Sequence, residues 1–136
     1  MENAKPIAVT QYGLLSLITA TMYIENTQFI IKRNELERNL YKYYQDEKYK
    51  ILFQDVIARK YIDDLPYVDL SEAFINALAW GLLSMIQDFS PDTRYIINIP
   101  SDQEAEKLLN IYPENIKELV TSLVKDMCGP ERKRAA

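Results

Sequence analysis

The sequence predicts a mainly α-helical, single compact domain, and three observations favour this class. The chain has 136 residues, 48% of them hydrophobic, which suits one domain with a substantial core. Apolar residues recur at three- and four-residue spacings between capping residues and prolines. Two long stretches, Ile7 to Ile24 and Ala73 to Gln87, contain no charged residue. A surface helix normally has a charged face, so each stretch should be central to the fold or covered by another chain.

The first uncharged stretch predicts a helix over residues 8–25, with Leu14, Ile18 and Met22 on one face. A second face is polar but uncharged, and it supplies four candidate protein-interface residues: Tyr12, Ser16, Thr19 and Tyr23. Side chains that combine an apolar body with a polar tip suit a partly buried surface, so we expect this face to be shielded. Scattered hydroxyl residues and the lack of a basic start argue against a membrane span or a signal peptide.

The next segments predict a short strand over residues 28–32 and two helical stretches, 34–45 and 49–63. Asn34 is a candidate N-cap, and Glu37 stands at the matching position of a capping box. Whether 34–63 forms one helix or two stays open at this stage. Pro66 ends the helical pattern, because proline cannot continue a helix and restricts the residue before it.

The second uncharged stretch predicts the central apolar helix of the domain, over about residues 70–89. Asp69 and Glu72 form a capping box at its start, and apolar residues surround its axis. Trp80 is expected to be fully packed, in which case Trp80→Ala would cost about 3–5 kcal/mol. Asn76 and Ser84 interrupt the apolar pattern and would need hydrogen-bond partners if they are buried.

The remaining sequence predicts a strand and two helices. Residues 93–99 are rich in β-branched side chains and should pair with residues 28–32 in a minor two-stranded β element. A capping box at Ser101 begins a short helix to about Asn110, and an amphipathic helix follows Pro113. The total is five to six helices in a domain spanning residues 1–130. Residues 131–136 are expected to form a disordered basic tail.

The residue inventory restricts the chemistry that this chain can perform. With no histidine and one cysteine, Cys128, it cannot form Ser–His or Cys–His pairs, an internal disulfide or a multi-cysteine metal site. Asp63, Asp64, Asp69 and Glu72 do not match a calcium-loop spacing and are interpreted as loop and capping residues. We therefore predict no catalytic residue, no metal site and no cofactor.

Ten tyrosines accompany a single tryptophan, and several fall between lysines in the segment from Leu40 to Lys50. This pattern fits an amphipathic helix at the edge of the core, a protein-contact surface rich in tyrosine, or a surface for single-stranded nucleic acid. Tyr41 and Tyr44 join the candidate interface residues. The net charge of −4 makes contact with a phosphate backbone unfavourable.

We therefore expect a non-enzymatic regulatory or inhibitory protein that acts through protein–protein contacts. Its partner would be itself or another protein, with a dimer or other homo-oligomer favoured, in the cytoplasm and without membrane association. The abundance of Ile, Asn, Lys and Tyr is typical of AT-rich bacterial or phage coding. One alternative is a nucleic-acid-binding regulator of winged-helix-like type. The other is a carboxylate-dependent enzyme, whose sign would be an Asp or Glu with a raised pKa in a closed pocket.

Overall fold

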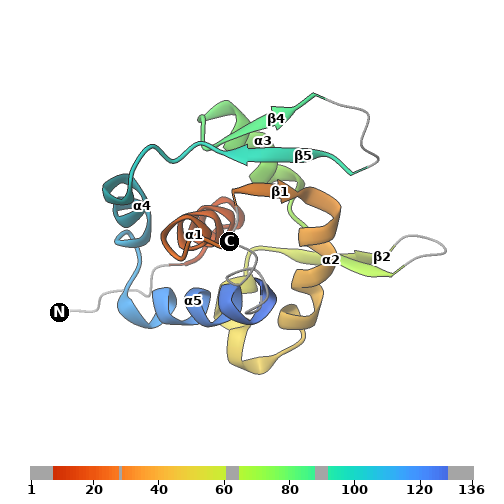
Figure 1. Cartoon of the computed structure of the whole chain (residues 1–136). Coiled ribbons are helices and arrows are strands. Elements are labelled where there is room, and N and C mark those ends of the chain that lie inside the picture. Colours follow the sequence, from red (N-terminus) through yellow and green to blue (C-terminus); the bar gives the residue numbers. More distant parts are fainter. Residues whose placement is uncertain (1–7, 28, 61–64, 88–91, 129–136) are drawn as a thin grey trace.

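The computed structural model describes residues 8–27, 29–60, 65–87 and 92–128. Within these residues, six helical segments combine with a three-stranded and a two-stranded antiparallel sheet (Figure 1). The elements in chain order are α1 (Gln11–Ile24), β1 (Ile30–Lys32), α2 (Arg33–Tyr44), the 3-10 helix η1 (Glu47–Phe53), β2 (Ile57–Lys60), β3 (Pro66–Asp69), α3 (Ser71–Ala79), β4 (Leu83–Ile86), β5 (Arg94–Ile97), α4 (Asp102–Leu109) and α5 (Glu114–Cys128).

The helix at the centre of the domain is α1, which confirms the first predicted helix. Residues Gly13 to Met22 are all buried, and α3, α4 and α5 pack around them (Figure 1). The Thr10 side chain caps the helix by accepting a hydrogen bond from the Gly13 N–H. Gly13 also lies against the Tyr112 hydroxyl, so closely that a Cβ atom would collide with it. A helix without charged residues is stable here because the rest of the chain covers it.

The predicted central helix over residues 70–89 is wrong. The helix α3 ends at Ala79, Trp80 is its C-cap, and Gly81 has a φ of +83°. Glycine adopts this left-handed conformation without a Cβ penalty, and it commonly ends helices for that reason. The chain then turns into β4, and the Trp80 side chain is 66% exposed rather than packed.

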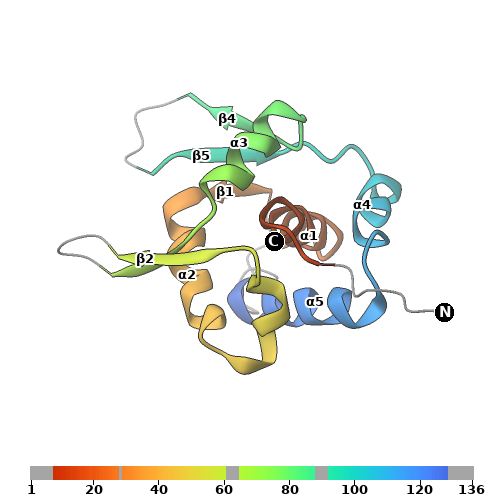
Figure 2. The ribbon, with the colours of Figure 1, turned by 180° about the vertical axis from the view of Figure 1, so that it is seen from behind.

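The predicted pairing of two strands is confirmed, and β4 adds a third. The sheet order is β1-β5-β4, with Ile31 opposite Tyr95 and Ile97 opposite Leu83 on the buried face. The helix α3 lies on this face, where the Phe74 and Tyr95 rings are 4.8 Å apart (Figure 2). On the other face of the sheet, Ile30 and Ile96 are neighbours and remain exposed.

The predicted helix over residues 34–45 is confirmed as α2, but the predicted helix over 49–63 is wrong. The chain forms η1, capped by the Asp46 side chain, and then β2, which pairs with β3 in a hairpin. The expected capping box at Asn34 does not form. Instead, the Asp92 carboxylate accepts hydrogen bonds from the Asn34 and Glu35 N–H groups, at 2.8 and 3.1 Å.

The two C-terminal helices are confirmed. The Ser101 hydroxyl caps α4, and α5 buries the apolar stripe of Ile116, Val120, Leu123 and Val124. The expected basic tail lies outside the described residues, so the boundary at residue 130 stays a prediction. Among the described helices, none combines the length and apolar character required to cross a bilayer.

Candidate protein-interaction surface

The uncharged polar face of α1 is mostly covered by this chain itself. Ser16 and Thr19 are buried, and their hydroxyls donate to the backbone carbonyls of Gly13 and Ser16 at 2.9 and 3.0 Å. Their hydrogen-bonding needs are therefore met within the helix. A partner protein cannot reach either side chain while the domain stays folded, so they do not contribute to a docking surface.

Tyr12 and Tyr23, at the two ends of α1, are half-buried and touch exposed aromatic residues. The Tyr12 ring packs edge-on against Trp80, with centroids 4.7 Å apart, and the Tyr23 ring packs edge-on against Phe29 at 5.8 Å. Burial raises the pKa of Tyr12. Each tyrosine thus packs against an exposed aromatic side chain from outside α1.

The tyrosine-rich segment mainly joins α2 and η1 to α5. Tyr43 and Tyr49 are buried, and the Tyr43 hydroxyl donates a hydrogen bond to the Asp126 carboxylate. Burial, together with this carboxylate, strongly raises the pKa of Tyr43. Tyr41 and Tyr44 are half-buried and stack with centroids 6.1 Å apart. Tyr43 and Tyr49 therefore fit the interpretation that this segment covers the edge of the core. Tyr41 and Tyr44 are only partly covered and leave part of each ring exposed.

The structure has an exposed apolar surface on α3 and β4, which the candidate interface residues predicted from the sequence do not include. Ile75 is 65% exposed, Leu78 36% and Met85 47%, and Trp80 stands at the end of the same helix. We call these four residues the α3–β4 surface. In the sequence, its signal is the uncharged stretch from Ala73 to Gln87, which apolar periodicity places in a central helix. Figure 2 shows α3 in front of the sheet, with its C-terminal turn beside β4.

Within the described residues, the strand β4 is the outer strand of the three-stranded sheet, with Leu83 buried and Met85 exposed. The Asn98 N–H donates to the Leu82 carbonyl at 2.8 Å. Because hydrogen-bonding direction alternates along an antiparallel strand, the backbone N–H and C=O groups of the even-numbered residues of β4 point towards β5. The backbone groups of Leu83 and Met85 consequently face away from the sheet. Natural edge strands are usually protected by a charge, a proline or a bulge, and Leu83–Ile86 contains no charge or proline.

A polar cleft between α2 and the β2–β3 hairpin holds the other notable charges. The Glu37 carboxylate is buried, where it accepts hydrogen bonds from the Leu70 N–H at 2.9 Å and the Arg33 Nε at 3.4 Å. Burial raises the pKa of Glu37, although both donors act in the opposite direction. This is the kind of carboxylate that the enzyme alternative requires. Because Glu37 holds the backbone at the start of α3, we assign it a structural role.

The second carboxylate of this cleft belongs to the predicted acidic cluster. Burial opposes ionisation of Asp69, but hydrogen bonds from the Ser71 N–H and the Arg59 guanidinium outweigh it and lower the pKa. Glu72 lies exposed in the first turn of α3, and Asp63 and Asp64 lie outside the described residues. Among the described residues, no three Cys, Asp or Glu side chains gather as metal ligands would.

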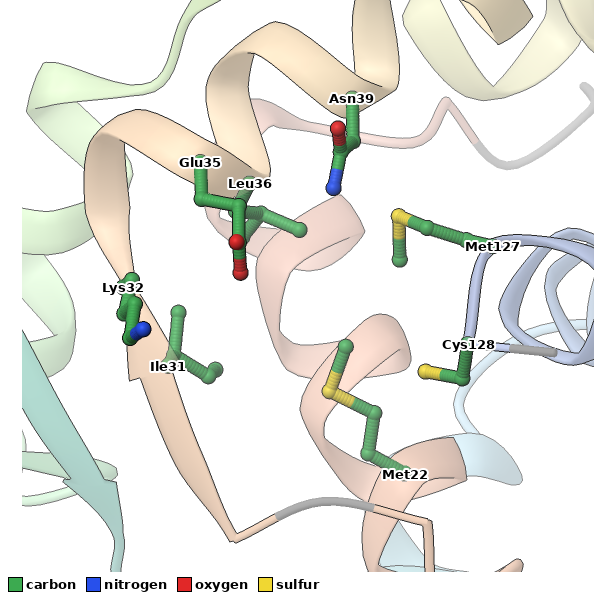
Figure 3. Close-up of a pocket in the computed structure, with 8 residues that line it drawn as sticks. All are labelled: Met22, Ile31, Lys32, Glu35, Leu36, Asn39, Met127 and Cys128. Atoms are coloured by element: carbon green, nitrogen blue, oxygen red, sulfur yellow. The ribbon is translucent and has the colours of Figure 1, made fainter. Parts of the chain in front are cut away.

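A small cavity of about 40 Å³ separates the ends of α1, α2 and α5. Figure 3 shows the sulfur atoms of Met22, Met127 and Cys128 around this space, opposite Ile31 and Leu36. Cys128 stands at the C-terminus of α5, where the helix dipole disfavours a thiolate. Methionine and cysteine are adaptable, polarisable packing residues, and this role accounts for them here.

Comparison with known proteins gives no match: no protein-family model, curated protein or solved structure resembles this chain. We therefore infer the function from the chain's own surface.

Proposed function

We propose that this protein is a non-enzymatic regulatory or inhibitory protein that acts through protein–protein contacts at the α3–β4 surface. One observation carries the proposal: four large apolar side chains are exposed within one short stretch of the chain that contains no charge. Contiguous exposed apolar surface, more than single exposed residues, marks an interaction site. We also propose that the protein is of bacterial or phage origin and works in the cytoplasm, as its composition indicates.

The composition of the surface supports a protein partner. Trp80 is the anchor, because tryptophan is among the residues that most often dominate binding energy, and Tyr12 holds its ring from one side. Ile75 and Leu78 lie three residues apart and so share one face of α3. Burying such area contributes about 25 cal/mol per Å² before the costs of association are subtracted.

The proposal is tested by comparing tagged variants in the native host. We expect wild type to retain a partner that the double variant Ile75→Glu, Trp80→Glu loses, because each carboxylate would be desolvated in the interface. The matched control is Ile57→Glu, since Ile57 is 54% exposed but lies on the β2–β3 hairpin. Quantitative mass spectrometry of the captured proteins provides the measurement. Retention of the same proteins by the double variant would contradict the proposal.

The order of the elements supports a second candidate, the winged-helix-like regulator. Helix, strand, helix, helix and a two-stranded wing, with sheet order β1-β5-β4, correspond to that topology if η1 to β3 is an insertion. The helix α3 would then be the recognition helix that enters the major groove. Its one charged residue is Glu72, which repels phosphate, so we rank this candidate second. A salt-sensitive mobility shift of a duplex DNA probe would reverse the ranking.

A further inference from the structure

We infer that the first turn of α1 positions α3, and with it the α3–β4 surface, by holding α3 at both of its ends. The positioning residues are the neighbours Gln11 and Tyr12. Gln11 contacts the first turn of α3, and Tyr12 contacts the side chain of its C-cap, Trp80. Neither positioning residue belongs to the α3–β4 surface. The expected effect on partner binding rests on the proposed function, whereas the effect on α3 itself does not.

The start of α3 lacks the cap that a helix usually receives from its own N-cap residue. That residue is Leu70, whose side chain makes no capping hydrogen bond. A Ser, Thr, Asp or Asn at this position would accept from the backbone N–H of the second or third helical residue. The third helical residue is Ala73, and its N–H donates to Gln11 Oε1 at 2.9 Å. A side chain of α1 therefore replaces the local cap of α3.

Other N–H groups at the start of α3 are also bound by side chains. The Leu70 N–H donates to Glu37 at 2.9 Å. The Ser71 N–H donates to Asp69, also at 2.9 Å. The site that Gln11 occupies is partly buried, and a donor that has lost water without gaining an acceptor is unfavourable there. Loss of the Gln11 acceptor should therefore loosen α3 at the point where α1 holds it.

The end of α3 is held by the next residue of α1. The Tyr12 ring packs edge-on against Trp80 with centroids 4.7 Å apart, and α1 and α3 pack against each other along the chain between these contacts (Figure 2). The exposed side chains of Ile75 and Leu78 lie in sequence between the two points that α1 holds. Their placement for a partner should therefore depend on both contacts.

The first turn of α1 is itself anchored, which it must be to support another helix. The Gln11 N–H donates to the Asp55 carboxylate, between η1 and β2, at 2.9 Å. The Thr10 hydroxyl accepts from the Gly13 N–H in the same turn. Helix ends fray when their first N–H groups have no partner, and these two bonds oppose that.

The test uses the purified protein and two readouts, one at each end of α3. Amide hydrogen exchange reports on the Ala73 N–H, and acrylamide quenching reports on Trp80, the single tryptophan of the chain. Gln11→Met keeps the length of the side chain but has no oxygen acceptor. We expect exchange at Ala73 to become roughly fivefold faster, the effect of one net hydrogen bond, and quenching of Trp80 to increase.

A conservative variant and a matched control separate positioning from general destabilisation. Gln11→Glu retains an acceptor oxygen and should restore both readouts. Gln45→Met makes the same substitution at an exposed residue, the C-cap of α2, and should change neither readout. A local cap alone would alter exchange at Ala73 and leave Trp80 as it is in wild type. That result, or no change at either end in Gln11→Met, overturns the inference.

The reverse experiment acts on the other end of α3. Tyr12→Leu removes the ring that contacts Trp80 and leaves Gln11 in place. We expect quenching of Trp80 to increase and exchange at Ala73 to become faster, because the two contacts hold one short helix. An unchanged Ala73 amide in this variant contradicts the inference, since the two ends would then be independent. Far-ultraviolet circular dichroism checks that each variant is folded.

Partner capture separates this inference from the proposed function. Tagged Gln11→Met should retain less partner than wild type, and Gln11→Glu should retain as much as wild type. If Gln11→Met retains the wild-type amount while the double variant Ile75→Glu, Trp80→Glu loses the partner, the positioning role is overturned and the proposed function stands. If the double variant loses nothing, the proposed function fails, and the two readouts on purified protein still decide whether α1 positions α3.

Discussion

Phe74 lies in α3 and Trp80 is the C-cap of that helix, and the two aromatic residues of this apolar stretch contribute very differently. Phe74 is buried, where its ring contacts Tyr95 and lies 5.3 Å from the Arg33 guanidinium. Trp80 is mostly exposed and touches Tyr12. Sequence alone ranks the two residues equally, because helical spacing assigns both to an apolar stretch and does not show where the helix ends.

We expect Phe74→Ala to lower the free energy of unfolding by about 3–5 kcal/mol, through lost burial and the cavity left behind. Trp80→Ala should cost only about 0.5–1.5 kcal/mol, the range of an aromatic pair contact. Urea denaturation of both purified variants gives the comparison. Similar losses for the two would mean that Trp80 is packed after all.

Glu37 gives the domain a specific dependence on pH. Because burial raises the folded-state pKa, the folded state binds the proton more tightly than the unfolded chain, whose value is near 4.5. The contribution of Glu37 to stability is therefore fully present below the unfolded pKa, and it declines as the pH rises through the folded pKa.

Glu37→Gln cannot titrate, so it should lack this contribution to the pH dependence. We expect the free energy of unfolding of wild type, minus that of the variant, to decrease as the pH rises above 4.5, the unfolded-state pKa. Denaturant melts at several pH values measure this difference. A difference that instead increases with pH would show that Arg33 and the Leu70 N–H outweigh burial in setting the pKa of Glu37.

At the scale of elements, the sequence predicted helices well where one periodicity persists between clear ends. The helices α1, α2, α4 and α5 match the expected segments, and Ser101 caps α4 as its capping box indicated. The predictions failed where two short elements share one apolar run. Residues 70–89 combine α3 with β4, and residues 49–63 combine part of η1 with β2. The glycine at position 81 is the sequence signal for the boundary between α3 and β4, since its positive φ ends α3.

Long-range contacts could not be predicted in the same way. Asp92 lies just before β5 and caps α2, and the residues around Asn34 give no indication in the sequence that Asp92 accepts these hydrogen bonds. The same limit applies to the candidate site. The tyrosine and hydroxyl pattern of α1 indicated a shielded face, but which chain shields it depends on how α3, α4 and α5 pack.

The contact between α1 and the segment after α4 provides a test at this scale. Gly13→Ala should destabilise the domain by about 1–3 kcal/mol, because the new Cβ would collide with the Tyr112 hydroxyl. The double variant Gly13→Ala, Tyr112→Phe should recover much of this loss, since the nearest atom is removed. Thermal melts of the single and double variants measure the coupling. Additive effects would contradict the close packing of these two residues.

At the scale of the whole molecule, the chain combines a well-covered central helix with an exposed apolar surface on α3 and β4. Charged residues occupy much of the remaining exterior, and several form pairs, such as Lys107 with Glu104 and Lys125 with Glu25. Such surface pairs contribute little to stability, but they keep those regions polar. The α3–β4 surface differs from these regions because it lies in a stretch without charged residues. We expect another chain to cover this surface when the protein functions.

Hydroxyl-radical labelling of Trp80 and Met85 tests this claim most directly, because both side chains react readily when exposed. The labelling is compared between dilute purified protein and intact cells that express the chain at its native level, with half-buried Tyr41, outside this surface, as an internal reference. We expect strong labelling of Trp80 and Met85 in dilute solution and marked protection of both in cells, relative to Tyr41. Equal labelling in the two settings would contradict it, because no partner would then cover the surface.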